Sequence, residues 1–319
     1  DAVPYVYEIP LGTRFRGIER RRGVVWEGPA GWAEFSPFEE YPPSEAAAWW
    51  RAAREAAEAG FPPPVRRSVP VNVTIPAVGP ARAEQLIAQA AGTTTAKVKV
   101  AEPGQTAAQE ADRVAAVRSA LGPRGRIRVD ANGAWDVDTA VDRIRRLDRA
   151  AGGLEYAEQP CRTAEELARV RRLVAIPVAA DESIRRAADP LRVKALQAAD
   201  VVVLKAQPLG GVRACLRLAE ALDLPVVVSS AVETSIGLAM GLALAAALPR
   251  LDFACGLGTL PLLEGDLVED GLRPAAGELP VCGPVAPSPR LLQRWAAPAP
   301  VRAAWLERLD AARRLAGPP

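Results

Sequence analysis

Charged residues stand at the ends of short apolar segments along the middle of the chain. In chain order they are Lys97, Lys99, Asp130, Glu158, Asp181 and Lys205. Carboxylates are the ligands that hard divalent cations such as Mg²⁺ prefer. A lysine whose pKa is lowered from about 10.4 by a cation and a second lysine can accept a proton near neutral pH. Together these groups predict enolisation, in which a cation binds a substrate carboxylate and a lysine removes the neighbouring proton.

The sequence of 319 residues contains no histidine. This excludes Ser-His-Asp and Cys-His catalysis, histidine zinc sites and an imidazole base, so other groups must do any acid–base work. Lysine itself is rare, because 36 of the 40 basic residues are arginine. Lys194 lies in a polar, helix-like segment and is interpreted as a surface charge, whereas the other three lysines fall in apolar segments. Since arginine stays protonated, these three positions indicate a need for a removable proton.

A repeating pattern of strands and helices positions these residues. Eight β-rich segments alternate with helical segments from about residue 69 onward. Their C-terminal ends lie 23 to 31 residues apart, at Ile75, Lys99, Asp130, Glu158, Asp181, Lys205, Ser229 and Gly256. Each interval accommodates one strand, one helix and two short loops, and eight such units predict a (β/α) barrel whose strand ends meet at one mouth. An open doubly wound sheet is the competing topology, but no GxGxxG motif follows the first strand.

Alternation of side chains along the strands places the candidate groups inside the barrel. Lys97 and Lys99 are two residues apart and therefore point to the same side of their strand. Burying two ammonium groups is costly unless anions lie opposite, and the next three strands supply carboxylates. Ser229, Ser230 and Gly256, at the last two strand ends, are candidates for binding the substrate. For the serines the alternative is capping of the strand end, and for the glycine it is a tight turn.

The two ends of the chain differ from the repeating part. Residues 3–9 predict a strand, the arginine-rich segment between Ile18 and Val25 predicts a short loop, and residues 44–60 predict a helix with a serine cap and a terminal glycine. The segment GFPPPV at 60–65 interrupts this pattern. The predicted division is an α+β domain over 1–65, the barrel over 66–285 and a returning C-terminal segment over 286–319.

Five short motifs carry a family resemblance. They are KVK at 97–99, DAN at 130–132, EQP at 158–160, DES at 181–183 and LK at 204–205. In this order the chain resembles the enolase superfamily, specifically its muconate-lactonising-enzyme-like subgroup. The resemblance covers most of the chain and implies a (β/α)₇β barrel with an α+β capping domain formed by the N-terminus and the C-terminal tail.

The resemblance also implies a role for each charged residue. The metal ligands are Asp130, Glu158 and Asp181, which bind Mg²⁺, with Mn²⁺ as a substitute. Lys99 is the base on one face of the substrate, and Lys205 sits on the other face. The supporting residues are Lys97, Asn132 and Glu182.

Longer strings favour one branch of the subgroup. The segments GWAEFSPF at 31–38, RVDANGAW at 128–135 and SSAVETSIG at 229–237 are similar to those of o-succinylbenzoate synthases. This resemblance implies a hydro-lyase of menaquinone biosynthesis, which dehydrates 2-succinyl-6-hydroxy-2,4-cyclohexadiene-1-carboxylate to 2-succinylbenzoate. Lys99 would remove the proton and return it to the leaving hydroxide from the same face, while Lys205 would stay an ammonium that stabilises the intermediate.

Three alternatives remain open at the level of sequence. An N-succinylamino acid racemase would use the same two lysines as opposed acid and base. A Schiff-base aldolase would use Lys205 as its nucleophile and would leave the three carboxylates unexplained. A non-catalytic barrel that binds small anions would need no metal. The last barrel strand reads GLGTLPLL and lacks the DxD motif of dipeptide epimerases.

Composition limits the partners and the compartment. The formal net charge of +2 gives no electrostatic basis for binding nucleic acid or an anionic membrane. The longest apolar run, 236–248, is too short to span a bilayer and predicts a buried helix. The four cysteines are far apart and are expected to be free thiols. No secretion signal is recognisable at the N-terminus, so we expect a cytoplasmic enzyme with a small-molecule carboxylate substrate, and the oligomeric state is left open.

Overall fold

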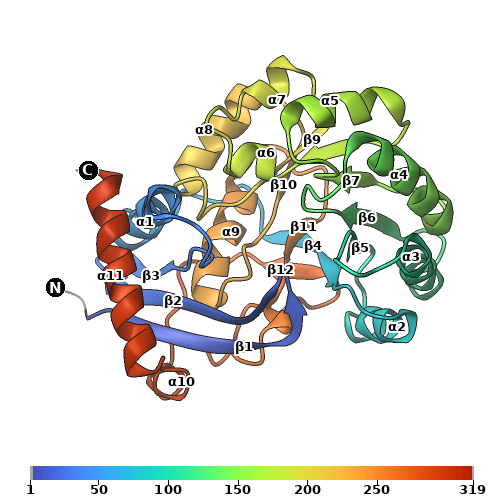
Figure 1. Ribbon diagram of the computed structural model, residues 1–319. Helices are drawn as coiled ribbons and strands as arrows, with labels where there is room; N and C mark the ends of the chain where they lie inside the picture. Colours follow the sequence, from blue (N-terminus) through green and yellow to red (C-terminus); the bar gives the residue numbers. More distant parts are fainter. Residues whose placement is uncertain (1–2, 318–319) are drawn as a thin grey trace.

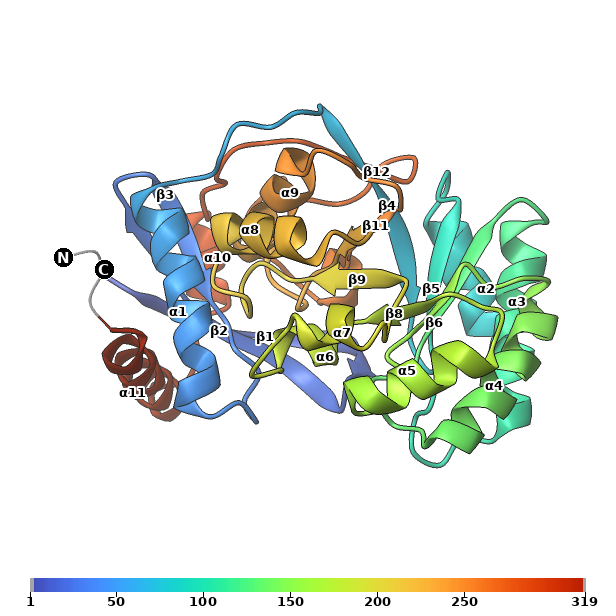
Figure 2. The same cartoon turned by 90° about the horizontal axis from the view of Figure 1, so that it is seen from above.

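A computed structural model describes residues 3–317 and shows a small antiparallel sheet beside a larger barrel (Figures 1 and 2). The small sheet contains β1 (Tyr5–Phe15), β2 (Ile18–Gly28) and β3 (Gly31–Phe35), in that order. Helix α1 (Pro43–Glu58) packs against β3. This layer forms the cap over one end of the barrel.

Eight parallel strands form the barrel. They are β4 (Ser68–Ile75), β5 (Thr95–Lys99), β6 (Arg126–Asp130), β7 (Tyr156–Glu158), β8 (Val178–Ala180), β9 (Val201–Leu204), β10 (Val226–Val228) and β11 (Cys255–Gly258). Neighbours in sequence pair from β4 to β10, and β11 pairs with β4. A parallel bridge between Ser229 and Gly256 joins β10 to β11 and completes the ring.

Helices connect each strand to the next around the outside of the barrel (Figure 1). They are α2 (Pro80–Gln89), α3 (Ala107–Leu121), α4 (Val137–Ala151), α5 (Ala164–Leu173), α6 (Glu182–Arg185), α7 (Arg192–Ala195), α8 (Val212–Leu222) and α9 (Ser235–Ala247). Helices α6 and α7 share one connection, so seven βα units are followed by a last strand. The predicted (β/α)₇β barrel with an α+β cap is confirmed.

Local sequence explains where these elements begin. Thr106 and Thr163 cap α3 and α5, and in both helices the third residue returns a side-chain hydrogen bond to the cap. Helix α9 is apolar on all sides because it lies between the barrel and β3 of the cap. The predicted buried helix over the longest apolar run is thus confirmed.

The prediction of a short loop between Ile18 and Val25 is wrong, because β2 runs through this segment. The turn lies earlier, at Arg16 and Gly17, which both have positive φ values of 52° and 75°. Two such residues suit the tight turns that join twisted antiparallel strands. Arginines at successive positions then alternate between the two faces of β2, which hides the strand pattern in the sequence.

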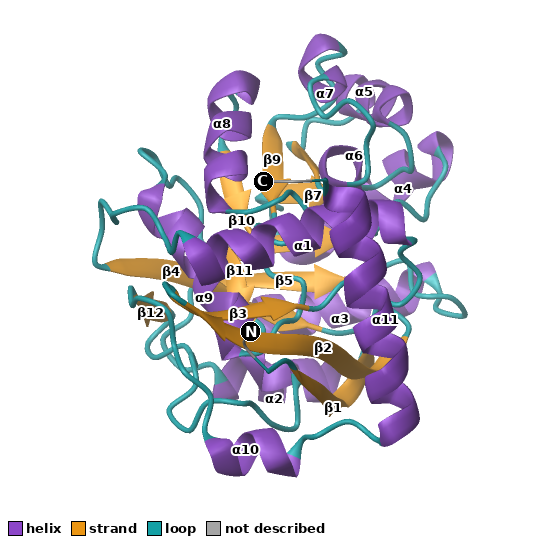
Figure 3. Ribbon diagram, turned by 90° about the vertical axis from the view of Figure 1, so that its left-hand side faces the viewer, coloured by secondary structure: helices purple, strands orange, loops and turns teal. Residues whose placement is uncertain are grey.

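The C-terminal segment lies against the cap. A short 3₁₀ helix η1 (Leu260–Leu262) and β12 (Glu278–Pro280) follow the barrel, and then come α10 (Pro289–Arg294) and α11 (Ala299–Ala316). Helix α11 packs along α1 and also contacts β1 and β2 (Figure 3). The exact division of the chain into 1–65, 66–285 and 286–319 stays a prediction.

All four cysteines are free, and only Cys282 is partly exposed. No helix in the described part of the chain combines the length and apolar composition needed to cross a bilayer.

Trp305 tests how firmly α11 holds the cap. Its side chain is 5% exposed, and its ring meets Phe35 edge-on at a centroid distance of 6.4 Å. We expect Trp305→Ala to lower the free energy of unfolding by about 3 to 5 kcal/mol, because truncation leaves a cavity at this contact. The control Leu315→Ala, on the exposed side of the same helix, should change it by less than about 0.5 kcal/mol. Urea unfolding followed by circular dichroism measures both, and equal stabilities would show that α11 does not anchor the cap.

Candidate active site

The predicted charged residues meet at the C-terminal mouth of the barrel. Lys99 of β5 pairs with Asp130 of β6, and Asp130 pairs with Glu158 of β7. Asp181 directly follows β8, and Lys205 directly follows β9. Strands β5 and β9 are four places apart in a ring of eight, so their lysines stand on opposite sides of the mouth.

These side chains form a buried network of ion pairs. The Lys97 Nζ lies 3.4 Å from Asp130 Oδ2 and 3.2 Å from Glu158 Oε2. The Lys99 Nζ lies 2.6 Å from Asp130 Oδ2, and all four side chains are at most 8% exposed. Across the mouth, Lys205 Nζ lies 2.7 Å from Asp181 Oδ2. The arrangement satisfies the requirement that charges removed from water be paired.

The three carboxylates differ in how well they are compensated. Burial opposes ionisation of Asp130, but Lys99 and Lys97 outweigh it and hold its pKa below the usual range. For Asp181, Arg185 and Lys205 have the same effect. Glu158 is the exception, because burial and the neighbouring Asp130 raise its pKa and Lys97 offsets this only in part. Ionisation of Glu158 is therefore the least well supported of the three, and an added cation would favour its charged form.

The lysines also differ. Burial disfavours the charge of Lys97, but Glu158 and Asp130 outweigh burial and raise its pKa, so Lys97 is held as an ammonium. Burial lowers the pKa of Lys205 despite the opposing charge of Asp181, and the Arg185 cation adds to the decrease.

Asn132 and Glu182 lie beside the charged groups and hydrogen-bond to each other, and their supporting role stays a prediction. The side-chain amide nitrogen of Asn132 donates to Glu182 Oε1 at 3.0 Å, and Lys99 Nζ donates to Asn132 Oδ1. Asn132 has a positive φ of 48°, a conformation that asparagine tolerates better than most residues. Its backbone N–H donates to Asp130 Oδ1 at 3.0 Å, which orients that carboxylate.

Sequence reasoning missed three residues that hold the site together. Arg185 donates to Asp181 Oδ1 at 2.8 Å and to Glu182 Oε1 at 2.7 Å, and it also donates to the hydroxyl of Tyr41 from the cap. Gln159 Oε1 accepts the backbone N–H of Asp181 at 2.9 Å. An arginine four residues after Asp181 on a helix was a usable signal for an ion pair. The contact of Tyr41 with Arg185 had no signal in the sequence.

The cap reaches the site at the tip of the β1–β2 hairpin. Lys99 Nζ lies 5.3 Å from the centroid of the Phe15 ring, which is itself only 8% exposed. This contact combines an apolar cover with the attraction between a cation and an aromatic face. Phe15 therefore excludes water from the side of the mouth that holds Lys99.

The donor set suits a hard divalent cation. Asp130, Glu158 and Asp181 offer only oxygen ligands, and the Oε2 of Glu182 is buried without a hydrogen-bond partner. Within residues 3–317, no three acidic or thiol side chains already stand in a metal-ligand arrangement, and lysine ammonium groups lie against the carboxylates instead. The assignment of these three residues as ligands stays a prediction.

The candidate substrate-binding residues lie at the same mouth but are already engaged. Ser230 Oγ lies 2.5 Å from Thr259 Oγ1 and accepts the backbone N–H of Val232 at 2.9 Å. Ser229 makes only a long contact of 3.4 Å with the carbonyl of Gly256. A Cβ at position 256 would stand 2.5 Å from Ser229 Oγ, so glycine is required there for close strand contact. Binding of substrate by these residues stays a prediction.

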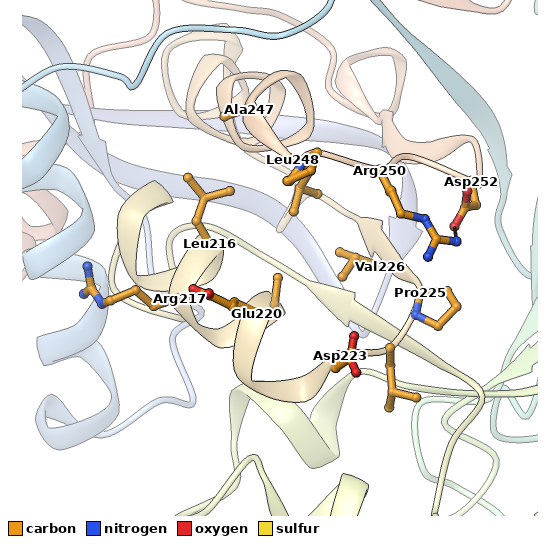
Figure 4. Close-up of a pocket in the computed structure, with 13 residues that line it drawn as sticks. Leu216, Arg217, Glu220, Asp223, Pro225, Val226, Ala247, Leu248, Arg250 and Asp252 are labelled. Carbon is orange, nitrogen blue, oxygen red and sulfur yellow. Dashed lines mark hydrogen bonds and ion pairs between the residues drawn. The ribbon is translucent and has the colours of Figure 1, made fainter.

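A separate cleft of about 590 Å³ lies at the opposite end of the barrel (Figure 4). It is bounded by α8, by the start of β10 at Val226 and by the segment after α9. Its charged lining residues include Arg250 and Asp252, which pair with each other at 2.8 Å. None of the six strand-end charges lines this cleft, so we do not assign the chemistry to it.

Two family models match the chain in the order that the fold predicts. Residues 6–57 match the enolase N-terminal domain-like family, and residues 81–287 match the enolase C-terminal domain-like family. The first range covers the three strands of the cap and most of α1, and the second covers the barrel from α2 onward.

Individual relatives agree with these matches. The o-succinylbenzoate synthase of Thermobifida fusca is 63% identical over 96% of this chain and 95% of that protein. The o-succinylbenzoate synthase of Mycolicibacterium smegmatis is 50% identical over 98% of this chain and 95% of that protein. The solved muconate lactonizing enzyme of Pseudomonas putida has the same fold, with a TM-score of 0.75 at 18% identity over 93% of this chain and 99% of that one. The resemblance seen in the sequence is thus confirmed, and the chain belongs to the enolase superfamily.

Proposed function

We propose that this chain catalyses the reaction of the o-succinylbenzoate synthases. In that reaction, a hydro-lyase removes water from 2-succinyl-6-hydroxy-2,4-cyclohexadiene-1-carboxylate and releases 2-succinylbenzoate for menaquinone biosynthesis. The relatives that bear this name match nearly the whole chain. The observation that carries the proposal is the meeting of three carboxylates with lysines from two opposite strands at one barrel mouth.

The carboxylates of Asp130, Glu158 and Asp181 would hold the divalent cation, for which we propose Mg²⁺, with Mn²⁺ as a substitute. When bound, the cation supplies positive charge to the substrate carboxylate and to the enediolate formed from it. The raised pKa of Glu158, caused by burial and by Asp130, is consistent with this assignment, because a bound cation would favour the charged carboxylate. Oxygen donors without histidine or thiolate also favour a hard ion over zinc.

Lys99 is proposed as the base. In its neutral form the amine takes the proton next to the substrate carboxylate, and the electron pair of that C–H bond enters the enediolate. The C–O bond to the hydroxyl then breaks, and Lys99 gives the same proton to the departing hydroxide, so water is the second product. One base suffices because both transfers occur on one face. The Phe15 ring covers this lysine and limits access of bulk water.

Lys205 is proposed to act as a fixed cation on the other face. Its Nζ is held 2.7 Å from Asp181 Oδ2, and it needs no proton exchange in this elimination. An ammonium at that place stabilises the negative charge of the enediolate without moving. Lys97 carries a raised pKa and supports Lys99 as a permanent charge between Asp130 and Glu158.

The alternatives are less favoured. A racemase for N-succinylamino acids would need both lysines to exchange protons, whereas the relatives from Thermobifida fusca and Mycolicibacterium smegmatis bear the name of the synthase. A Schiff-base aldolase would leave Lys97, Lys99 and the carboxylates without a role. A barrel that only binds anions does not account for the enzyme family to which the chain belongs.

The direct test compares two activities of the wild-type protein with Mg²⁺ present. Ultraviolet absorbance follows formation of the aromatic product, and polarimetry follows N-succinylamino acids. We expect dehydration to be the faster reaction and to stop when the divalent cation is removed by a chelator. Faster racemisation than dehydration would reverse the assignment, and turnover that persists without any divalent cation would exclude the metal-assisted route.

Lys99→Arg tests the identity of the base. Arginine keeps the positive charge but does not release its proton, so kcat for dehydration should fall about 10²- to 10⁴-fold. Lys194→Arg is the matched control, since Lys194 is an exposed lysine whose Nζ donates to the Ala221 carbonyl. Circular dichroism should show both variants folded. Turnover by Lys99→Arg at the rate of the control would remove Lys99 from the role of base.

A further inference from the structure

Arg21 is a buried cation in the middle of the arginine-rich segment of β2. It is 2% exposed and forms no ion pair with any carboxylate in the described part of the chain. Its neighbours behave differently, because Arg20 and Arg22 both pair with Glu8 on the adjacent strand, at 3.1 and 2.6 Å. A buried guanidinium that is not used for an ion pair needs another explanation.

The guanidinium of Arg21 donates to backbone carbonyls of two domains. Its Nε donates to the Val232 carbonyl at 3.0 Å, and its Nη2 donates to the Ala231 carbonyl at 2.9 Å. The same Nη2 donates to the Ser36 carbonyl of the cap at 2.6 Å. The ring of Phe38 lies 4.7 Å from the guanidinium carbon. The planar guanidinium group of arginine can donate hydrogen bonds to several acceptors at once, whereas the ammonium group of lysine is a compact point charge.

The carbonyls that Arg21 holds belong to the β10–α9 loop, residues 229–234. Val232 in this loop has a φ of 59°, which is a true outlier for a β-branched residue. Such strain persists only where the surroundings fix the backbone. The loop amides are also held, since Ala231 N–H donates to Glu233 Oε2 at 2.8 Å and Val232 N–H donates to Ser230 Oγ at 2.9 Å. Arg21 holds the backbone carbonyls of the same loop through its hydrogen bonds to Ala231 and Val232.

Two buried carboxylates, Glu34 and Glu233, lie close enough to Arg21 to interact with its charge, although neither forms an ion pair with it. Burial raises the pKa of Glu34 and of Glu233, and the Arg21 cation opposes that rise in both. Glu34 anchors the other end of the loop, because its Oε2 accepts the Gly237 N–H at 3.0 Å and the Thr234 hydroxyl. The cap therefore holds the loop at two points.

The loop starts at the mouth that holds the proposed chemistry. Ser229 N–H donates to the carbonyl of Leu204, which directly precedes Lys205. Ser229 also bridges to Gly256 of β11. The conformation of the loop thus sets where the backbone and hydroxyl groups of Ser229 and Ser230 stand beside Lys205. Arg21 itself contacts neither a lysine nor a carboxylate of the site.

We propose that Arg21 is a positioning residue that fixes the substrate-binding side of the mouth from the cap. It holds the β10–α9 loop in its strained conformation, and the loop presents the 229–230 segment to the end of the substrate remote from the reacting carbon. This inference rests on the proposed function. It predicts a role in binding the substrate and none in the proton transfer of Lys99.

Steady-state kinetics of the Mg²⁺-loaded enzyme test this role. Arg21→Met should raise KM for the cyclohexadiene carboxylate about tenfold while changing kcat less than about threefold, because the reacting groups stay in place. The KM of Arg21→Lys should lie between those of Arg21→Met and wild type, because one ammonium group can replace only some of the hydrogen bonds of the guanidinium group. The control is Arg20→Met on the same strand, whose side chain is 53% exposed, and its KM should equal that of wild type.

Hydrogen exchange supplies a readout that does not depend on activity. Peptides covering 229–234 should exchange faster in Arg21→Met and Arg21→Lys than in Arg20→Met, while peptides of β5 and β9 stay unchanged. Wild-type KM in Arg21→Met, a fall in kcat alone, or faster exchange spread evenly over the whole cap would each overturn the proposal. If Arg21→Met fails to fold, Arg21→Lys decides by the same criteria. Failure of the proposed function would appear separately, as wild-type enzyme that forms no aromatic product.

Discussion

The need to neutralise buried charge governs the mouth of this barrel. Three carboxylates and three ammonium groups are withdrawn from water there, and each ammonium lies within 3.4 Å of a carboxylate oxygen. Removing any one partner would leave an uncompensated buried charge, which is far more costly than losing a surface ion pair. The balance is nevertheless incomplete at Glu158, whose pKa is raised by burial and by Asp130. A cation bound beside Glu158 would favour its charged form.

The barrel and the cap divide the task of holding these charges. Strand register places Lys99, Asp130 and Glu158 at one level, and closure of the ring by Ser229 and Gly256 sets Lys205 on the opposite side. The cap then contributes three contacts from above: Phe15 over Lys99, Tyr41 on Arg185, and Arg21 on the loop after β10. The barrel strands thus place the charged groups, while the separately packed cap holds the substrate-binding side in position.

Much of the site could be predicted from the sequence because strands have a short, regular period. Two lysines at 97 and 99 must share a side of their strand, and eight strand ends at similar intervals must meet at one mouth. The residues that escaped prediction act through contacts between distant segments. Tyr41 and Arg185 lie 144 positions apart, and Arg21 and Val232 lie 211 apart, so no local pattern marks either pair. The strand β2 was missed for a different reason, since a buried arginine at position 21 breaks the apolar alternation on which strand prediction depends.

The central claim is that one divalent cation joins Asp130, Glu158 and Asp181 at the mouth of the barrel. A crystal structure of the protein grown with Mg²⁺ and 2-succinylbenzoate tests this most directly. The account predicts a single ion with an oxygen ligand from each of the three carboxylates, the carboxylate of the product on the same ion, and Lys99 and Lys205 on opposite faces of the product ring. An ion bound elsewhere, or a product-bound structure in which Lys97 and Lys99 still pair with Asp130 and no ion is present, would contradict it.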